Sequence, residues 1–268
     1  MLILFSFFSV YIGFPSNAVL GVEWASNGNH IISCSADKTV SVWDANKGVR
    51  VRKFTDHEGI VNCLAVAKSD PCLFISGSDD CTAKIWDSRT KWAVQSIEHE
   101  YQVTSIAMAD DGRCFFTGGI DNIIRKFNLT EDSHTPDVSM EGHMDTITGL
   151  AISPDGSYLL SNAMDSTLRK WDVRPFATGD RCLMFYEGVH HGAEKGLLKA
   201  SWSADGEMVS CGSADRIVHI WDSTTGRQLY YLPGHKGAVN EVLFHQKEPI
   251  VVSCSSDKTI FLGELMEE

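Results

Sequence analysis

Three sets of histidine, serine and aspartate recur along the chain with nearly the same spacing. They are His57, Ser76 and Asp80, then His143, Ser161 and Asp165, and finally His235, Ser253 and Asp257. These are the residue types of a hydrolase triad, in which the histidine activates the serine hydroxyl. A nucleophilic triad occurs once per active site, whereas this set returns from repeat to repeat. The repetition therefore favours a structural network inside each repeat over catalysis.

Cysteines and histidines also raise the possibility of a metal site. The eight cysteines contain no CxxC pair, although Cys63, Cys72 and Cys81 are evenly spaced. Cys72 and Cys81 would lie at opposite ends of one strand, roughly 30 Å apart at ~3.3 Å per residue, so they cannot share an ion. His190 and His191 have no further ligand at a suitable spacing. We expect no metal and no cofactor, and we interpret the cysteine pattern as that of a reducing compartment.

The elements that must position these residues are six copies of one sequence unit. Each copy places an aspartate six residues before an aromatic residue or its substitute: Asp37–Trp43, Asp80–Trp86, Asp121–Phe127, Asp165–Trp171, Asp215–Trp221 and Asp257–Gly263. Successive aspartates are 43, 41, 44, 50 and 42 residues apart. A period of about 40–45 residues with a terminal Trp-Asp pair is typical of the blades of a WD-repeat β-propeller.

Each copy also has the strand pattern of a blade. In the second copy, apolar or alternating runs at 60–66, 73–77, 83–87 and 93–97 are separated by turn residues, as four short strands require. The aspartate falls in the turn between the second and third runs, where a carboxylate can accept hydrogen bonds from backbone amides. We therefore predict an all-β WD40 β-propeller with six recognisable repeats. Resemblance to the WD family implies that Trp86 and Trp171 join two of the sets in buried tetrads.

Some positions depart from the repeat pattern. Ser16-Asn17 stands where the first unit would carry Gly-His, and His99 is preceded by Glu98. Lys126 and Lys170 occupy a third-strand position that is apolar in the other repeats. We expect these two blades to present that position to solvent or to a partner.

Segments between the repeats resemble one particular family. They are EYQVTS (100–105), TGGIDN (117–122), SNAMDSTLRKWDVRPF (161–176), LPGHKGAVNEVLFHQKEPI (232–250) and SSDKTIFLGE (255–264). Together they are similar to the WD-repeat protein of the U5 small nuclear ribonucleoprotein, from about Ala18 to Leu265. The resemblance implies a nuclear protein of pre-mRNA splicing that docks onto the large U5 core protein, without catalysis of its own.

The amino terminus does not fit the family pattern. The family has seven blades, and most of an N-terminal blade is absent here. We divide the chain into an apolar segment at 1–17 and a propeller at 18–268. The run MLILFSFFSVYIGF contains no charge and is too short to span a bilayer comfortably. We interpret this run as an outer strand of an incomplete blade or as a wrongly assigned start, with a secretory signal as a minor alternative.

Partner contacts are expected in loops, where insertions tend to carry binding function. Two long connections follow the fourth Trp-Asp pair, at 174–181 and 186–196. The candidate contact residues are Tyr101, Gln102, Arg174, Phe176, His190, His191, Glu194 and Lys195. Simple alternatives are a solvated loop for 190–195 and a cover over the core for Phe176.

Charge and missing motifs narrow the functional class. The net charge of −12 disfavours a broad phosphate-binding surface, although Arg50, Arg52 and Lys53 form a local basic stretch that we interpret as a solvated strand edge. Neither a GxxxxGK[ST] loop nor an HExxH pair is present in the sequence, which disfavours an enzyme. We predict a non-catalytic scaffold that binds proteins, reaches RNA only indirectly through its particle, and binds no membrane and no small-molecule substrate. The alternative is a WD adaptor of another complex, either a ubiquitin-ligase substrate receptor or a chromatin scaffold.

Overall fold

The computed structural model describes residues 15–129, 135–177 and 179–265, and the apolar run at 1–14 lies outside these ranges. The chain divides into two compact units. Unit 1 contains residues up to 117 together with 125–138, and unit 2 contains 118–124 together with 139–268. Within the described ranges all regular elements are β-strands, which form six antiparallel sheets. The number of sheets equals the number of repeats predicted from the sequence.

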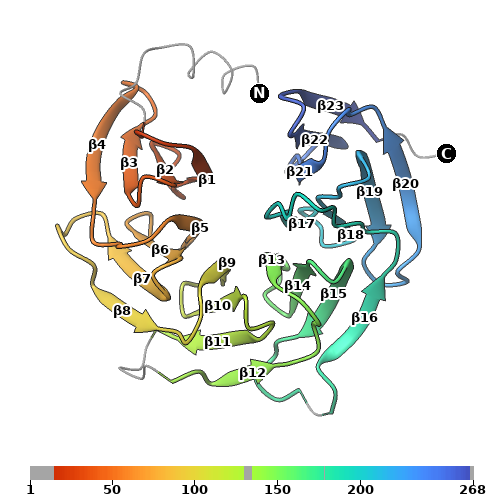
Figure 1. The fold of residues 1–268 in the computed structure, drawn as a ribbon, viewed down its shortest axis with the longest axis horizontal. Coiled ribbons are helices and arrows are strands. Elements are labelled where there is room, and N and C mark those ends of the chain that lie inside the picture. The colour runs from red at the N-terminus through yellow and green to blue at the C-terminus, as the bar shows by residue number, and fades with distance from the viewer. Residues whose placement is uncertain (1–14, 130–134, 178, 266–268) are drawn as a thin grey trace. The chain divides into compact units, whose positions relative to one another are not determined.

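Three sheets belong mainly to unit 1 (Figure 1). The first contains β1 (Val19–Trp24), β2 (His30–Ser35), β3 (Val40–Asp44) and β4 (Val49–Phe54). The second contains β5 (Val61–Val66), β6 (Leu73–Ser78), β7 (Thr82–Asp87) and β8 (Gln95–Glu98). The third contains β9 (Val103–Met108), β10 (Cys114–Gly119), β11 (Ile124–Asn128) and β12 (Val138–Met140).

Three further sheets belong to unit 2. The fourth contains β13 (Ile147–Ile152), β14 (Tyr158–Ala163), β15 (Thr167–Asp172) and β16 (Cys182–Tyr186). The fifth contains β17 (Ala200–Trp202), β18 (Met208–Cys211), β19 (Ile217–Asp222) and β20 (Gln228–Pro233). The sixth contains three strands in the described chain, β21 (Val239–Phe244), β22 (Ile250–Ser255) and β23 (Ile260–Glu264).

The burial of each strand follows from its place in the sheet. Second strands such as β6 and β14 are buried at every position after the first, and each begins with three apolar or aromatic residues followed by a serine. Fourth strands such as β4 and β20 lie at the end of their sheets, and nearly all of their residues are exposed or half-buried. This difference is expected, because a strand covered on both faces needs apolar residues at every position.

The hydrophobic core of each unit lies between consecutive sheets. In unit 1, Phe54 of the first sheet packs with Phe74 and Trp86 of the second. In unit 2, Tyr186 of the fourth sheet packs with Trp221 of the fifth. A sheet of this kind cannot bury both of its faces alone, so each repeat depends on its neighbours for stability.

Candidate functional site

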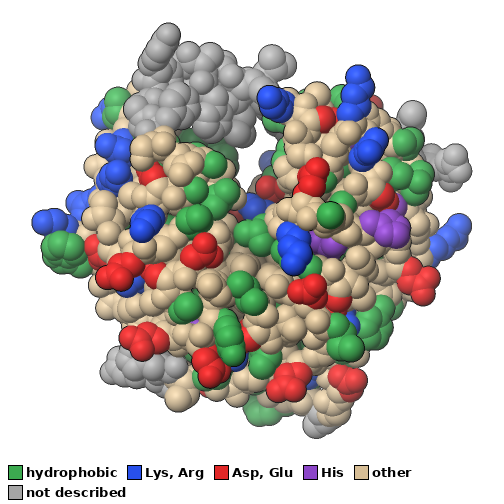
Figure 2. Space-filling view, viewed as in Figure 1, with side chains coloured by type: hydrophobic (Ala, Val, Ile, Leu, Met, Phe, Trp, Pro, Cys, Tyr) green, Lys and Arg blue, Asp and Glu red, His purple; other side chains and the backbone are tan. Residues whose placement is uncertain are grey.

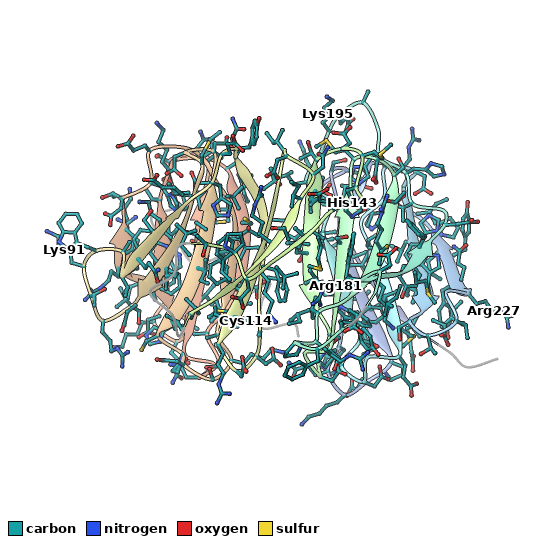
Figure 3. The ribbon with its side chains drawn as sticks, turned by 90° about the horizontal axis from the view of Figure 1, so that it is seen from below. Lys91, Cys114, His143, Arg181, Lys195 and Arg227 are labelled. Atoms are coloured by element: carbon teal, nitrogen blue, oxygen red, sulfur yellow. The ribbon has the colours of Figure 1, made fainter. Side chains whose placement is uncertain are left out.

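The fourth sheet brings His143, Ser161, Asp165 and Trp171 together in one hydrogen-bonded chain. The indole Nε1 of Trp171 donates to Ser161 Oγ at 2.7 Å, and Ser161 Oγ lies 2.6 Å from His143 Nε2. His143 Nδ1 lies 3.0 Å from Asp165 Oδ2. β14 carries the serine, β15 carries the tryptophan, the turn between them carries the aspartate, and the loop before β13 carries the histidine. Figure 3 shows His143 among the strands of unit 2.

The second sheet repeats this geometry, and the sixth sheet repeats most of it. His57 lies 2.7 Å from both Ser76 Oγ and Asp80 Oδ2, and Trp86 Nε1 donates to Ser76 Oγ at 2.7 Å. In the sixth sheet His235 lies 2.8 Å from Ser253 Oγ and 3.3 Å from Asp257 Oδ2. Gly263 leaves no indole there, and the ring of Phe261 stacks on His235 at 4.3 Å instead. The structure thus brings together all three sets.

The chemistry of the end groups fixes the direction of each hydrogen bond. An indole N–H can only donate, and an ionised carboxylate can only accept. The serine therefore accepts from tryptophan and donates to histidine Nε2, and the histidine donates from Nδ1 to the aspartate. In this arrangement every donor and acceptor of the hydrogen-bonded side chains has a partner. It requires a neutral imidazole, because a protonated histidine would leave the serine hydroxyl without an acceptor.

The pKa values of the fourth set agree with that assignment. Burial lowers the pKa of His143 below its usual value of 6.5 and outweighs the opposing hydrogen bond to Asp165. For Asp165, burial favours the neutral acid, but hydrogen bonds from His143, from Thr167 and from the Met144 amide outweigh it. Together they hold the pKa of Asp165 well below its usual value. The pair is therefore a neutral histidine bound to a carboxylate.

Burial separates these sets from a hydrolase triad. The order serine, histidine, aspartate is that of a nucleophilic centre, but Ser76 and Ser161 are 0% exposed. In addition, a tryptophan N–H donates a hydrogen bond to the serine oxygen that would have to attack a substrate. Neither hydroxyl can reach a substrate in this structure, so these two sets hold strands together and do not form a reactive centre.

The first repeat replaces the histidine, and the third keeps a histidine but has a threonine and a phenylalanine in place of the serine and the tryptophan. In the first, the backbone amide and hydroxyl of Ser16 donate to Asp37 Oδ2 at 2.9 and 3.2 Å. Trp43 still donates to Ser33 Oγ at 2.8 Å. In the third, His99 Nε2 lies 2.9 Å from Thr117 Oγ1, and its ring contacts Phe127.

The fifth repeat carries a replacement that the sequence pattern did not indicate. Cys211 stands at the serine position, and the histidine comes from within β19. His219 Nε2 lies 2.6 Å from Asp215 Oδ2, and the imidazole stacks on Trp221 at 5.6 Å. The indole of Trp221 donates to the Glu187 carbonyl at 3.1 Å. A search for histidine upstream of the aspartate misses this arrangement, although the i,i+4 spacing of Asp215 and His219 is visible in the sequence.

Two further features of the aspartate turn recur. In four repeats a threonine two residues after the aspartate donates its hydroxyl to the second carboxylate oxygen, at 2.5–2.6 Å: Thr39, Thr82, Thr167 and Thr259. In all six repeats the residue directly after the aspartate has a positive φ of 60–74°: Lys38, Cys81, Asn122, Ser166, Arg216 and Lys258. This conformation is unfavourable for residues other than glycine. The hydrogen bonds of the aspartate hold the turn in it.

The prediction that Lys170 faces solvent or a partner is wrong. Lys170 is only 9% exposed, and its ammonium donates to the Ser223 carbonyl at 2.8 Å. The ammonium also lies over the rings of Tyr158 and Trp202, at 4.3 and 5.5 Å. It therefore links the fourth and fifth sheets at a pocket of about 640 Å³. Lys126 is half-buried, with its ammonium 5.9 Å from the Phe116 ring.

The predicted contact residues at 101–102 and 174–176 differ in exposure and in their contacts within the chain. Tyr101 is exposed, and Gln102 is half-buried. Arg174 is exposed, but its guanidinium is bound in bidentate fashion to Asp172, with contacts of 2.9 and 2.5 Å. Phe176 is 94% exposed, so the alternative that it covers the core is wrong.

The predicted contact residues at 190–195 lie in the connection between β16 and β17. His190, Glu194 and Lys195 are exposed, and Figure 3 shows Lys195 on a loop that projects past the strand ends. His191 is half-buried: its amide donates to Ser166 Oγ at 3.1 Å, and burial lowers the pKa of its ring. His191 therefore anchors this loop on the turn that contains Ser166.

Within the described ranges, no three or more histidine, cysteine, aspartate and glutamate side chains are grouped so that they could hold a metal ion. Within the same ranges, no helix is long and apolar enough to cross a membrane. The eight cysteines, all within the described ranges, form no disulfide bond.

Comparison with known families confirms the repeat assignment. The family described as WD domain, G-beta repeat matches the chain six times, at residues 7–44, 48–87, 92–128, 134–172, 181–222 and 226–262. Each match ends with the third strand of a sheet, and from the second match on it begins with the fourth strand of the sheet before. Together with the sheets, the matches confirm the predicted fold class, an all-β WD40 β-propeller with six recognisable repeats.

Comparison with individual proteins is more specific. The chain is 46% identical over 247 residues to the U5 small nuclear ribonucleoprotein 40 kDa protein of Dictyostelium discoideum, covering 92% of this chain and 69% of that protein. It is 48% identical over 248 residues to the pre-mRNA-splicing factor cwf17 of Schizosaccharomyces pombe, covering 92% and 72%. The human U5 small nuclear ribonucleoprotein 40 kDa protein is 47% identical over 222 residues, covering 83% of this chain and 62% of the human protein.

Proposed function

Because this chain belongs to the WD40 repeat family, and within it to the family of the U5 small nuclear ribonucleoprotein 40 kDa protein, we propose that it is a non-catalytic protein-binding scaffold of pre-mRNA splicing. The observation that carries the proposal is identity of 46–48% over 92% of the chain to two of the relatives, one named for the U5 particle and one for splicing. The chain acts in the nucleus, as part of the U5 particle. It docks on the large U5 core protein and reaches RNA through that particle.

The arrangement of polar groups supports binding without catalysis. The histidine, serine and aspartate residues of the second and fourth repeats are used inside the sheets. A scaffold needs a rigid body with variable loops, because loops tolerate changes in sequence that the core does not. Exposed side chains at the ends of the strands, such as Tyr101, Phe176 and Lys195, are therefore the proposed partner contacts.

Isolation of the complexes formed by the tagged full-length chain in cells of its source organism tests this function. We expect recovery of U5 proteins and U5 RNA from nuclear extract. Recovery of a cullin ligase or of histone-modifying enzymes, without U5 components, would overturn the splicing role in favour of another WD adaptor.

Phe176→Ser is expected to reduce recovery of the U5 core protein by at least roughly tenfold if the side chain inserts into a partner, because buried aromatic anchors dominate interfaces. The melting temperature should change little, because the Phe176 side chain is almost fully exposed in the free chain. The matched control is Leu229→Ser, which removes an exposed apolar side chain from β20. Equal recovery with both variants would remove Phe176 from the interface.

A further inference from the structure

The outer edge of the first sheet combines positive charge with exposed apolar surface. β4 is the end strand of that sheet, and it carries Arg50, Arg52 and Lys53. The loop after β7 lies against β4, because the Arg52 guanidinium donates to the Thr90 carbonyl. That loop adds Lys91 and Trp92. We call Arg50, Arg52, Lys53, Lys91 and Trp92 the basic edge.

The exposed cations of the basic edge differ from neighbouring cations in their ion pairing, as far as the described residues show. Lys47 and Arg89, at its margins, form ion pairs with Asp44 and Asp87. Arg50, Lys53 and Lys91 are exposed, and in the part of the chain that the structure describes no ion pair joins them to an acidic residue. Figure 2 shows Lys and Arg side chains gathered along the left margin, over β4. Such a cluster is unexpected in a chain with a net charge of −12.

The apolar part of the basic edge is held open to solvent. Trp92 is 61% exposed, with the Lys91 ammonium 4.7 Å from its ring. Figure 3 shows Lys91 at the outer end of its loop, directed away from the strands. Val49, Val51 and Val94 are also exposed nearby. An exposed indole beside aliphatic side chains is typical of a surface that a partner covers.

The backbone of β4 provides a third element. Within the described residues its ladder hydrogen bonds run to β3, and no other strand pairs with it. The opposite edge therefore presents N–H and C=O groups to an extended peptide. Addition of a strand to a free sheet edge is a common mode of peptide recognition, with side-chain contacts giving specificity.

From these observations we propose that the basic edge binds an acidic, extended segment of a protein partner. Carboxylates of the segment pair with Arg50, Lys53 and Lys91, its backbone pairs with β4, and an apolar side chain covers Trp92. A single-stranded RNA fits less well, because such ligands need successive bases stacked on several aromatic rings and the basic edge has one. The inference rests on the protein-binding role proposed above, but it does not depend on which assembly the chain joins.

The test measures binding of a fluorescein-labelled poly-glutamate peptide to the purified full-length chain by fluorescence anisotropy at low salt. We expect the variant Arg50→Ser/Lys53→Ser/Lys91→Ser to bind roughly 10- to 100-fold more weakly, from a few-fold for each exposed charge pair. The control variant Arg227→Ser/Lys236→Ser/Lys247→Ser changes the net charge equally with exposed cations of unit 2. It should bind within about twofold of the unchanged chain, because none of these three cations belongs to the basic edge.

Three results would overturn the inference. The first is poly-glutamate binding no stronger for the unchanged chain than for the Arg50/Lys53/Lys91 variant. The second is an equal loss in the control variant, which would indicate attraction by overall charge. The third is tighter binding of oligouridylate through the same three cations, which would make the edge a nucleic-acid surface. Because purified components are used, each result is independent of the isolation of U5 complexes.

Discussion

Replacement of Asp165 by alanine is expected to lower the free energy of unfolding by about 3 kcal/mol. The carboxylate accepts hydrogen bonds from His143, from the Met144 amide and from the amide and hydroxyl of Thr167. It also lies 3.5 Å from the Arg169 guanidinium. Alanine would leave several of these donors buried without an acceptor, and would release the turn in which Ser166 has a φ of 60°. Chemical denaturation monitored by circular dichroism measures the change.

The matched control is Asp37→Ala in the first repeat. Asp37 occupies the same turn, but it receives hydrogen bonds from Ser16 in place of a buried histidine. We expect a smaller loss, about 1 kcal/mol, because Ser16 is exposed and can bind water when the carboxylate is removed. Equal losses for the two variants would mean that the histidine adds nothing. An unchanged melting temperature for Asp165→Ala would contradict the structural role of the tetrad.

Acid should remove the same stabilisation in two steps. The folded-state pKa values of His143 and Asp165 both lie below their usual values of 6.5 and 3.8. For both groups the unfolded chain therefore binds the proton more readily, so stability falls as pH falls. The histidine contribution declines below pH 6.5, and the aspartate contribution declines below pH 3.8. Asp165→Asn has no carboxylate at this position, so its stability should fall less steeply in the second range.

Replacement of Gly212 by valine is expected to destabilise the chain by at least about 4 kcal/mol. A Cβ atom at Gly212 would lie 2.6 Å from the carbonyl oxygens of both Val239 and Asn240. These oxygens belong to the backbone of β21, which lies close to Gly212 because the fifth and sixth sheets pack against each other there. Relief of the clash would require the two sheets to separate. Thermal unfolding of the purified variant measures the loss, and failure to obtain folded protein agrees with it.

Substitutions at two other glycines provide comparisons for the loss of stability expected at Gly212. A Cβ at Gly77 would lie 2.5, 2.8 and 3.0 Å from side-chain atoms of Val103, Cys63 and Ile106. Side chains can shift more easily than the backbone oxygens that a Cβ at Gly212 would meet, so Gly77→Val should cost less than Gly212→Val. A Cβ at Gly263 would meet no atom within 4 Å, and Gly263→Val should change stability by less than about 0.5 kcal/mol. A Gly212→Val protein as stable as Gly263→Val would contradict the close packing of β18 and β21.

The sequence by itself determined the six repeats, their four-strand pattern in five of them, and the residues of three histidine networks. These features could be predicted because they are local. In every copy the turn needs its aspartate, and the buried second strand needs apolar residues. The same residue types therefore recur at a fixed spacing. His143, Ser161, Asp165 and Trp171 belong to a single repeat, and the period alone aligns them with their counterparts.

Only the tertiary structure decided the positions where one repeat differs from the others. In the folded chain His219 contacts Asp215, and Ser16 takes the place of a histidine in the first repeat. Lys170 is buried and donates to the Ser223 carbonyl of the next sheet. The tertiary structure also placed Trp92 beside the cations of β4 to form the basic edge. The first two of these contacts lie within one repeat and depend on its own strands and turns. The burial of Lys170 and the position of Trp92 depend on the contact between neighbouring sheets. A side chain's environment there is set by residues roughly 40–50 positions away, which a repeat period cannot identify.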